Sequence, residues 1–517
     1  MEATCLRQTE LPHTSRLFSD FLYHFDRVRK YYENDHARVE YPESRRAEVV
    51  SALAQLNGPS ESLDRLARPG TVAVVTGQQV GLFSGPAYTV YKALTAVKLA
   101  RQMTAQGKPA VPVFWLATED HDFAEVNHAW VFDAASTPVR LEVSGPEILD
   151  HPVGGIRVES WHVDELRKAI APLAFGDEVA AVVEHAYTPG RTMGEAFHAL
   201  VGKLLERYGL IYLDPLHPAI RKVAAPILRT AISAGSDLSS LLLERNRELT
   251  AEGYHTQVHV EPQTSLFFVL DGDRRVHLKR QNGDYIAKDS RYAAAQLAEE
   301  AENLSPTALL RPVVQDYLLP TAAYIGGPAE LAYFAQSQVL YRQLIGGMPR
   351  LMPRSGFTLI DKRSERLMAR YGLELTDFFH GEDHLKARIS EKLVPQSLQG
   401  EFAQTNATAT QLLDSLQSSV AAFDPTLGAA AAKSRQKILY QLSKMEGKVA
   451  RESLRRDQRA AEDACYIFRS LFPQKHLQER FYGILPFLAR HGFDLLDTLY
   501  DNVHLECPDH IVLKLDQ

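Results

Sequence analysis

The chain has 517 residues, of which 45% are hydrophobic and 23% are charged, as in a globular protein with a sizeable core. A chain of this length exceeds one ordinary domain, so we expect two or three. The formal net charge is −7, from 57 basic and 64 acidic residues. This balance argues against nucleic acid or a membrane surface as a partner, because either requires a basic patch.

The N-terminal composition and the cysteines point to the cytoplasm. The first thirty residues mix charged and apolar side chains, so we expect no signal-peptide core, and no apolar run is long enough to span a membrane. Cys5, Cys465 and Cys507 lie far apart with no C-x-x-C pair, which fits a reducing compartment without a disulfide framework. All three stand outside the motifs described below, so we expect no role for them.

The first 70 residues are predicted to form a polar, helical segment, and an α/β pattern starts after them. The apolar run 72–75 predicts a buried parallel strand. Residues 88–99 predict a helix with its apolar side chains on one face. Glycines at 77, 81 and 85 would let the backbone approach a ligand, and the helix N-terminus offers free N–H groups.

The loop between this strand and helix is rich in polar side chains. Residues 76–86 match neither G-x-G-x-x-G nor the P-loop pattern, so a packing turn remains an alternative. A packing turn would carry small apolar residues, however, where this loop has polar side chains such as Gln78, Gln79 and Ser84. We therefore predict a ligand-binding loop whose candidate residues are Gln78, Gln79, Ser84, Gly85, Tyr88 and Lys92.

A second strand and polar loop follow directly. Residues 111–116 are predicted to be another buried strand, and its end carries Glu119-Asp120-His121-Asp122, with Asn127 and His128 close behind. In doubly wound sheets, ligands bind beyond the carboxyl ends of the strands. Both loops would open on that edge, which we predict to be the active site.

This acidic loop allows several interpretations. Two carboxylates and an imidazole could hold Mg²⁺ or Zn²⁺. Alternatively, His121 could perform acid–base chemistry beside Asp120 or Asp122, or the carboxylates could recognise a substrate amine. A solvated loop without function is the fourth possibility. We assign no metal ligand.

The predicted core extends over residues 71–363 and contains two insertions, at about 133–190 and 225–300. The first insertion begins with a β-rich, turn-broken stretch that includes Gly145-Pro146. A helix is expected over 192–208, a third buried strand over 209–214, and a strand leading into a hairpin over 267–273.

A second glycine-rich block spans residues 304–362. Its candidate functional residues are Arg311, Gln315, Glu330 and Tyr333. Arg311 could clamp a phosphate or carboxylate with its two-pronged guanidinium, or could form an interdomain salt bridge.

Long helices are predicted for residues 364–460. Leu413, Leu416, Val420 and Phe423 repeat at coiled-coil spacing, and so do Ile438, Leu442, Met445 and Val449. Asp424-Pro425 separates the two sets, which indicates an antiparallel hairpin or coiled-coil arm. Residues 461–517 are predicted to return to the core.

The motifs resemble one family over essentially the whole chain. They are Thr76-Gly-Gln-Gln-x-Gly-Leu-Phe-x-Gly-Pro, Trp115-x-Ala-x-Glu-Asp-His-Asp-Phe-x-Glu-x-Asn-His, Ser305-Pro-x-x-x-x-Arg-Pro-x-x-Gln and Gly326-Gly-Pro-x-Glu. They are similar to the BshC family, the cysteine ligases of bacillithiol biosynthesis. The resemblance implies an α/β fold with a Rossmann-like parallel-sheet core similar to nucleotidyltransferases, connecting-peptide insertions and a long α-helical coiled-coil domain that dimerises.

The resemblance also implies a cytoplasmic enzyme that adds L-cysteine to glucosaminyl-malate. Amide formation is uphill in water unless the carboxylate is activated, so we expect ATP as co-substrate, with Mg²⁺ as its possible companion. In this scheme the 78–86 loop binds a carboxylate or phosphate, Asp120 or Asp122 orients the ammonium, and His121 takes its proton. Arg311 and Lys92 would balance negative charge.

Two other classes of function stay open at this point. A metal-dependent hydrolase or transferase could use the Glu119–Asp122 loop on a small polar substrate. A non-catalytic interaction protein could be built on the coiled-coil arm, although polar residues clustered above a buried sheet reduce stability unless they serve a site.

Overall fold

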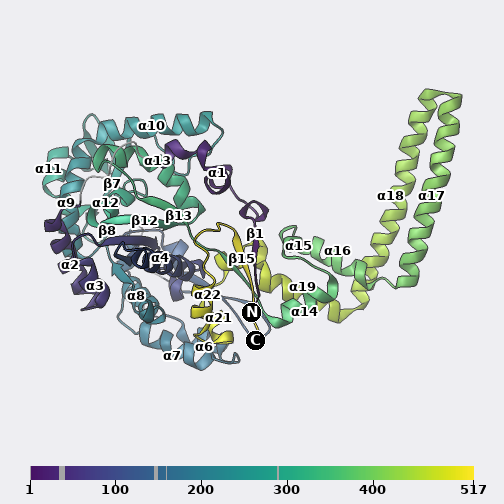
Figure 1. Cartoon of the computed structure of the whole chain (residues 1–517), viewed down its shortest axis with the longest axis horizontal. Coiled ribbons are helices and arrows are strands. Elements are labelled where there is room, and N and C mark those ends of the chain that lie inside the picture. The colour runs from purple at the N-terminus through teal and green to yellow at the C-terminus, as the bar shows by residue number, and fades with distance from the viewer. Residues whose placement is uncertain (1, 34–40, 145–149, 159, 288–289, 517) are drawn as a thin grey trace. The chain divides into compact units, whose positions relative to one another are not determined.

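The structure is a computed structural model that describes residues 2–33, 41–144, 150–158, 160–287 and 290–516. The chain divides into two compact units (Figure 1). The large unit contains Glu2–Thr358 and Glu479–Leu513, and the small unit contains Leu359–Gln478 and the last residues from Lys514. The four predicted segments remain a prediction, and the predicted turn at Gly145-Pro146 lies outside the described residues.

A five-stranded parallel sheet forms the centre of the large unit, as the sequence predicted. Its strand order is β13-β12-β2-β3-β6, and every neighbouring pair is parallel. The strands are β2 (Val72–Gln78), β3 (Ala110–Leu116), β6 (Ile211–Leu213), β12 (Thr321–Gly326) and β13 (Arg350–Pro353). Their non-consecutive order is that of a Rossmann-like fold with crossover connections.

Both faces of this sheet are buried, which explains why its strands are continuous apolar runs. Val75 and Val113 belong to the larger hydrophobic cluster, whereas Val74 and Ile325 belong to a second cluster. Successive side chains of a strand point to opposite faces, so neighbouring valines of β2 enter different clusters. Helix α4 (Tyr88–Ala105) packs against β2 and β3 (Figure 1).

Other predicted elements are present with shifted bounds. The helix expected over 192–208 is α8 (Met193–Leu204) followed by a 3-10 turn (Glu206–Tyr208). The expected hairpin is β7 (Thr264–Asp271) and β8 (Arg274–Gln281). These two strands belong to an antiparallel sheet of order β10-β9-β8-β7-β11. Its other strands are β9 (Asp284–Ala287), β10 (Ser290–Tyr292) and β11 (Leu304–Pro306).

The β-rich insertion starts earlier than predicted, with β4 (His128–Phe132) pairing with β5 (Pro138–Glu142). The N-terminal segment contains a strand that the sequence did not indicate, β1 (Glu2–Leu6). The chain passes between the units within β14 (Phe357–Ile360), α20 (Gln478–Phe481) and β15 (His510–Lys514). The other α-helices of the large unit are α1 (Arg16–Tyr23), α2 (Glu43–Asn57), α3 (Glu61–Leu66), α5 (Phe123–Val126), α6 (Val163–Ile170), α7 (Gly176–Ala186), α9 (Pro218–Ser233), α10 (Gly235–Ala251), α11 (Ala294–Glu299), α12 (Arg311–Leu318), α13 (Pro328–Leu344), α21 (Leu485–His491) and α22 (Leu495–Asp501).

The small unit is helical and contains the predicted long hairpin. Helices α17 (Gln396–Phe423) and α18 (Pro425–Arg456) run side by side (Figure 1). Asp424 ends one and caps the other, because its carboxylate accepts hydrogen bonds from the backbone N–H groups of Thr426 and Leu427. The remaining helices are α14 (Lys362–Tyr371), α15 (Leu375–Phe379), α16 (Glu382–Leu393) and α19 (Gln458–Leu471). No helix in the described ranges has the length and apolar character needed to cross a bilayer.

Candidate active site

A cavity of about 240 Å³ opens at the carboxyl end of β2, and we call it the strand-end cavity. Three stretches line it: the loop after β2, the segment 125–130 and residues 480–483. Among the predicted site residues, those lining this cavity are Gln78, Gln79, Gly85, Tyr88 and His128. The structure therefore gathers much of the predicted loop around one hollow.

The loop beneath this cavity is strained and contains unsatisfied polar groups. Phe83, Ser84 and Gly85 all have positive φ angles, of 50°, 75° and 64°, a conformation that costs non-glycine residues about 1–3 kcal/mol each. Among the described residues, the buried hydroxyls of Ser84 and Thr89 have no hydrogen-bond partner. Both lie close to the N-terminus of α4, where the helix dipole favours an anion, although the backbone N–H groups of Ala87 and Val90 already donate to protein carbonyls. Such a loop is suited to hold an oxygen-rich ligand group.

Lys92 forms the centre of a buried network beside this loop. The Lys92 side chain is 1% exposed, and its ammonium group donates to the Glu330 carboxylate at 2.7 Å, to the Gln78 side chain at 3.2 Å and to the Gly77 carbonyl. Burial lowers the pKa of Lys92, although Glu330 opposes this shift. Burial would raise the pKa of Glu330, but Lys92 and hydrogen bonds including that from Tyr324 outweigh it, so the pKa of Glu330 is lowered. The contact with Glu330 thus opposes the loss of charge that burial favours at Lys92.

Arg311 extends this network through α12. Its guanidinium donates to Gln315 Oε1 at 3.0 Å and to the Tyr333 hydroxyl at 2.8 Å. Burial works against the charge of Arg311, but Tyr333, Tyr324 and Glu330 outweigh it and raise its pKa. Both hydrogen-bond acceptors of Arg311 are neutral side chains, so these contacts are not the interdomain salt bridge considered for Arg311 as an alternative. All four predicted residues of the second block thus lie in one network with Lys92.

The acidic loop meets the first loop through Gln79. The Gln79 amide donates to Asp120 at 2.6 Å and to Glu125 at 2.8 Å. The other Asp120 oxygen accepts the backbone N–H of His121 at 2.7 Å and that of Asp122 at 3.4 Å. Asp122 is exposed and caps the short helix α5. Asp120 and Glu125 are therefore the carboxylates placed near the strand-end cavity.

His121 is held by a residue that the sequence did not single out. Arg275, on β8, donates to Nδ1 of His121 at 2.9 Å. The rest of its guanidinium binds Ser305 Oγ and the Pro306 carbonyl, each at 2.9 Å. Because arginine can only donate, Nδ1 accepts, and the proton of the neutral imidazole lies on Nε2.

Glu119 and Asn127 are not among the residues that line the cavity. Glu119 instead pairs with Arg221 of α9 at 3.2 Å. Burial raises the pKa of Glu119, although Arg221 and Arg275 oppose this shift. Asn127 contacts the His128 ring at 3.2 Å and the Glu142 carboxylate at 3.4 Å, which makes it a positioning residue for His128.

Three cavity residues were missed because they come from distant segments or carry no motif. The rings of Trp130 and Phe481 stack with centroids 4.6 Å apart and form an apolar wall. Arg480 is exposed at the rim, with its guanidinium 5.6 Å from the Tyr88 ring. Within the described part of the chain, Arg480 has no carboxylate at salt-bridge distance.

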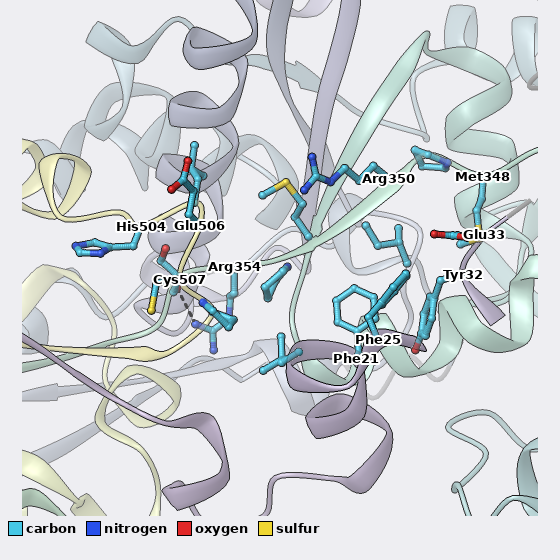
Figure 2. Close-up of a pocket in the computed structure, with 18 residues that line it drawn as sticks. Phe21, Phe25, Tyr32, Glu33, Met348, Arg350, Arg354, His504, Glu506 and Cys507 are labelled. Carbon is cyan, nitrogen blue, oxygen red and sulfur yellow. Dashed lines mark hydrogen bonds between the residues drawn. The ribbon is translucent and has the colours of Figure 1, made fainter. Parts of the chain in front are cut away.

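A larger cavity, of about 560 Å³, lies elsewhere in the large unit (Figure 2). Phe21, Phe25 and Tyr32 form one side, and the segment with His504, Glu506 and Cys507 lies opposite (Figure 2). None of the predicted site residues lines it. We call it the aromatic cavity.

The metal interpretation of the acidic loop finds no ligand set. Across the described ranges, no group of three or more His, Cys, Asp and Glu side chains is arranged to hold a metal ion. Within the acidic loop, the carboxylates of Glu119, Asp120 and Asp122 instead bind Arg221, the Gln79 amide and backbone N–H groups.

Comparison with known families decides the identity. Residues 1–355 match the model "Bacillithiol biosynthesis BshC, N-terminal Rossmann-like domain", and residues 357–515 match "Bacillithiol biosynthesis BshC, C-terminal coiled-coil domain". The chain belongs to the BshC family. The resemblance seen in the motifs is thus confirmed over both domains.

Two BshC relatives match over their whole lengths. One, from Solibacter usitatus, is 53% identical over 99% of this chain and 100% of its own. Another, from Koribacter versatilis, is 37% identical over 99% of both chains. Both carry the name "Putative cysteine ligase BshC", which agrees with the predicted ligase class.

Proposed function

We propose that the chain joins L-cysteine to glucosaminyl-malate by an amide bond, with ATP activating the cysteine carboxylate. Membership of the BshC family supports the pathway. The observation that carries the proposal is the strand-end cavity, where a helix N-terminus and Arg480 stand near Asp120 and Glu125. A site that joins a carboxylate to an amine needs an anion-binding side and an ammonium-binding side.

The anion-binding side is the N-terminus of α4. The unpaired hydroxyls of Ser84 and Thr89, together with the positive end of the helix dipole, can stabilise the oxygens of a carboxylate or phosphate. Arg480 adds a cation at the rim, and a guanidinium can bind such a group through two hydrogen bonds. We therefore assign the activated carboxyl group to this side.

The ammonium-binding side is the pair of carboxylates that share Gln79. Asp120 and Glu125 accept from the same amide nitrogen at 2.6 and 2.8 Å, which fixes both beside the loop. A protonated sugar amine would be attracted there and oriented toward the anion-binding side. The amine must lose a proton before it attacks the activated carboxyl carbon.

His121 can serve this step in one of two ways. With Arg275 donating to Nδ1, the ring presents an Nε2–H group, which can stabilise negative charge on the carboxyl oxygen. The sequence analysis predicted that His121 takes the proton from the amine. For this, the ring must lose its hydrogen bond from Arg275 and adopt the other tautomer, in which Nε2 carries the lone pair. The geometry favours the donor role, and the two roles are separable by substitution.

Lys92 and Arg311 do not line the strand-end cavity, and we assign them supporting roles. The Lys92 ammonium is already matched by Glu330, Gln78 and a backbone carbonyl, so we assign it to positioning Gln78 at the cavity. Arg311 binds only neutral side chains and keeps its charge available to balance a phosphate or carboxylate. Mg²⁺ would arrive with the nucleotide.

The experiment is product formation by the purified protein, followed by mass spectrometry. Glucosaminyl-malate, L-cysteine and ATP are supplied together and then omitted one at a time. We expect bacillithiol only when all three are present, with release of AMP or ADP identifying an acyl-adenylate or an acyl-phosphate. Product formed without ATP would overturn the proposal that ATP activates the cysteine carboxylate. Absence of product when all three compounds are present would overturn the assignment of the chain as this ligase.

We also propose a cytoplasmic homodimer joined through the small unit. Several large apolar side chains of the α17–α18 hairpin are exposed: Leu412, Leu416, Phe423, Leu427, Ile438, Tyr440 and Met445. Leu412 and Leu416 are four residues apart and Ile438 and Met445 seven, so each pair shares a helix face. The matching family model describes this region as a coiled-coil domain, and a second copy is the partner that supplies an identical face.

A further inference from the structure

Two of the three cysteines lie together although they stand at opposite ends of the chain. Cys5 is in β1, and Cys507 precedes β15, the neighbouring strand in the sheet. The Cys5 and Cys507 thiols are close enough for each to affect the ionisation of the other, and Cys507 contributes to raising the pKa of Cys5. Both residues belong to the large unit. Nothing in the sequence pairs them, because only the fold brings the segments of Cys5 and Cys507 together.

Neighbouring contacts hold the two segments in this register. The Gln8 amide donates to the Pro508 carbonyl at 3.1 Å. The Tyr23 hydroxyl donates to Asp509 at 2.6 Å and accepts the Gln8 backbone N–H at 2.9 Å. The proximity of the sulfurs is therefore built into the packing of the N-terminal segment on residues 507–509.

Both thiols can be reached by a small reagent. Cys5 is exposed and Cys507 is partly exposed, where it lines the aromatic cavity (Figure 2). Cys465 is on α19 in the small unit. It is also partly exposed, so it provides an unpaired comparison within the same molecule.

We propose that Cys5 and Cys507 form a reversible dithiol–disulfide pair that is oxidised by low-molecular-weight disulfides. The Cys507 thiolate attacks one sulfur of the small disulfide, whose S–S bond breaks and releases one small thiolate. Cys5 then gives up its proton and attacks Cys507 Sγ, which releases the second small thiol. Two protein thiols are oxidised, and one small disulfide is reduced to two thiols.

The order of attack follows from the surroundings of the two sulfurs. Burial and the adjacent Cys507 sulfur raise the pKa of Cys5, and Asp509 adds to this shift. Because Cys507 lines the aromatic cavity, where a small disulfide can lie, we assign it as the first thiol to react and Cys5 as the resolving thiol. The resulting bond would tie β1 to the 504–508 wall of the aromatic cavity, so oxidation would restrict movement of that wall. This chemistry is independent of the ligase assignment.

The test uses the full-length protein in buffers with graded ratios of reduced to oxidised glutathione. Free thiols are alkylated at each ratio, and peptides are mapped by mass spectrometry without reduction. We expect Cys5 and Cys507 to lose alkylation together and to appear in one linked peptide, while Cys465 stays alkylated. Absence of the linked peptide at every ratio, or oxidation of Cys465 at the same ratio, would overturn the proposal.

Three variants make the order of events visible. Cys5→Ser should stop at a mixed disulfide between glutathione and Cys507. Cys507→Ser should form no linked peptide and leave Cys5 mostly alkylated. Cys465→Ser is the matched control and should behave as the unsubstituted chain does. A mixed disulfide that accumulates on Cys5 rather than Cys507 would contradict the assigned order.

Discussion

Arg275 donates a hydrogen bond to Nδ1 of His121 at 2.9 Å. Its other nitrogens bind Ser305 and the Pro306 carbonyl, so the guanidinium is fixed from three sides. The imidazole is thereby set in the tautomer with its proton on Nε2. The chemistry of His121 therefore depends on a residue of the antiparallel sheet, and not only on the acidic loop in which it lies.

Substitution of His121 separates the donor role from the base role. His121→Ala should lower the rate of product formation by about 10²–10⁴-fold, the usual range for a positioned proton-transfer group. His121→Gln places an amide near the position of Nε2, and its N–H can donate but its amide is not a useful base. If donation is the role, this variant retains much more activity than the alanine variant.

The measurement is kcat for both variants, with folding checked by circular dichroism. A glutamine variant as inactive as the alanine variant would establish His121 as the base. Normal turnover by His121→Ala would remove His121 from the site altogether. Exposed His255 offers a matched control, since His255→Ala should leave kcat unchanged.

The Lys92–Glu330 pair should show strong energetic coupling. Glu330→Gln leaves a buried ammonium without its carboxylate, and Lys92→Met leaves the carboxylate without its ammonium. Breaking a buried ion pair in this way costs about 3–5 kcal/mol. The double variant removes both charges, so its loss should be clearly smaller than the sum of the two single losses.

The coupling is measured by urea unfolding followed by tryptophan fluorescence. All three tryptophans, Trp115, Trp130 and Trp161, lie in the large unit, so the signal reports the unit that contains the pair. Strictly additive losses would show that the two charges do not stabilise each other. Lys108→Met, at an exposed lysine, should change the free energy of unfolding by less than about 0.5 kcal/mol.

Much of the parallel sheet could be read from the sequence because its strands are buried on both faces. Runs such as 72–75 and 111–116 are continuously apolar, and a doubly buried strand requires this pattern. The topology then places the polar loops after β2 and β3 at one edge. The sequence therefore located the region of Gln79 and Asp120 without any structure.

The partners of these residues could not be read in the same way. Arg275 and Arg480 are single cations in unremarkable surroundings, and only long-range packing brings them to His121 and Tyr88. Periodicity reports which face of an element is buried, but it carries no information on which distant side chain meets it. The same reason hid the pairing of the two terminal cysteines.

Arg480 should contribute to substrate affinity at the strand-end cavity. Arg480→Ala removes a cation that has no carboxylate partner among the described residues, so we expect little loss of stability. A hydrogen bond to a charged group contributes about 1.5–3 kcal/mol, and exposure reduces this through salt screening. We therefore expect KM for one anionic substrate to rise about tenfold, with a smaller effect at high salt.

The check is steady-state kinetics with each substrate varied in turn. Arg68→Ala, at another exposed arginine of the large unit, should leave every KM unchanged. An unchanged KM for all substrates in Arg480→Ala would remove this residue from the anion-binding side.

The exposed apolar face of the α17–α18 hairpin should mediate dimerisation. Leu416 and Phe423 are 58% and 85% exposed, whereas Leu413 and Val420 of the same predicted set are only partly exposed. The predicted set is therefore split: Leu413 and Val420 are partly buried in the hairpin, whereas Leu416 and Phe423 lie on its exposed face. Leu416→Glu combined with Phe423→Glu should convert a dimer to a monomer in analytical ultracentrifugation, because charges would be buried at the joint.

Gln411→Glu is the control for added charge, since Gln411 is an exposed polar residue of the same helix. It should leave the dimer intact. If the unsubstituted chain sediments as a monomer at micromolar concentration, the proposed dimer is wrong, whatever the variants show.

Acidification should destabilise the large unit in two stages, and His510 should contribute to the first. Burial lowers the pKa of His510, although Glu479 opposes this shift. Below the ordinary histidine pKa of about 6.5, the unfolded chain therefore binds a proton that the folded chain does not. Stability then falls as pH decreases, by at most about 1.4 kcal/mol per pH unit for one histidine.

The second stage belongs to carboxylates. Burial would raise the pKa of Glu479, but Arg354 outweighs it and the pKa is lowered, as for Glu330. Their stabilisation is present above the ordinary glutamate pKa of about 4.3 and is lost as pH falls through the lower folded-state values.

Urea unfolding between pH 7.5 and 5 would isolate the first stage. His510→Asn should be less stable than the unsubstituted chain at pH 7.5, because a buried contact with Thr358 at 2.8 Å is altered, but it should lose less stability on acidification. Some dependence of the free energy of unfolding on pH should remain, since burial also lowers the pKa values of His198 and His277. His255→Asn, at an exposed histidine, should keep the full slope. An identical slope in His510→Asn would mean that His510 binds a proton equally well in the folded and unfolded chains.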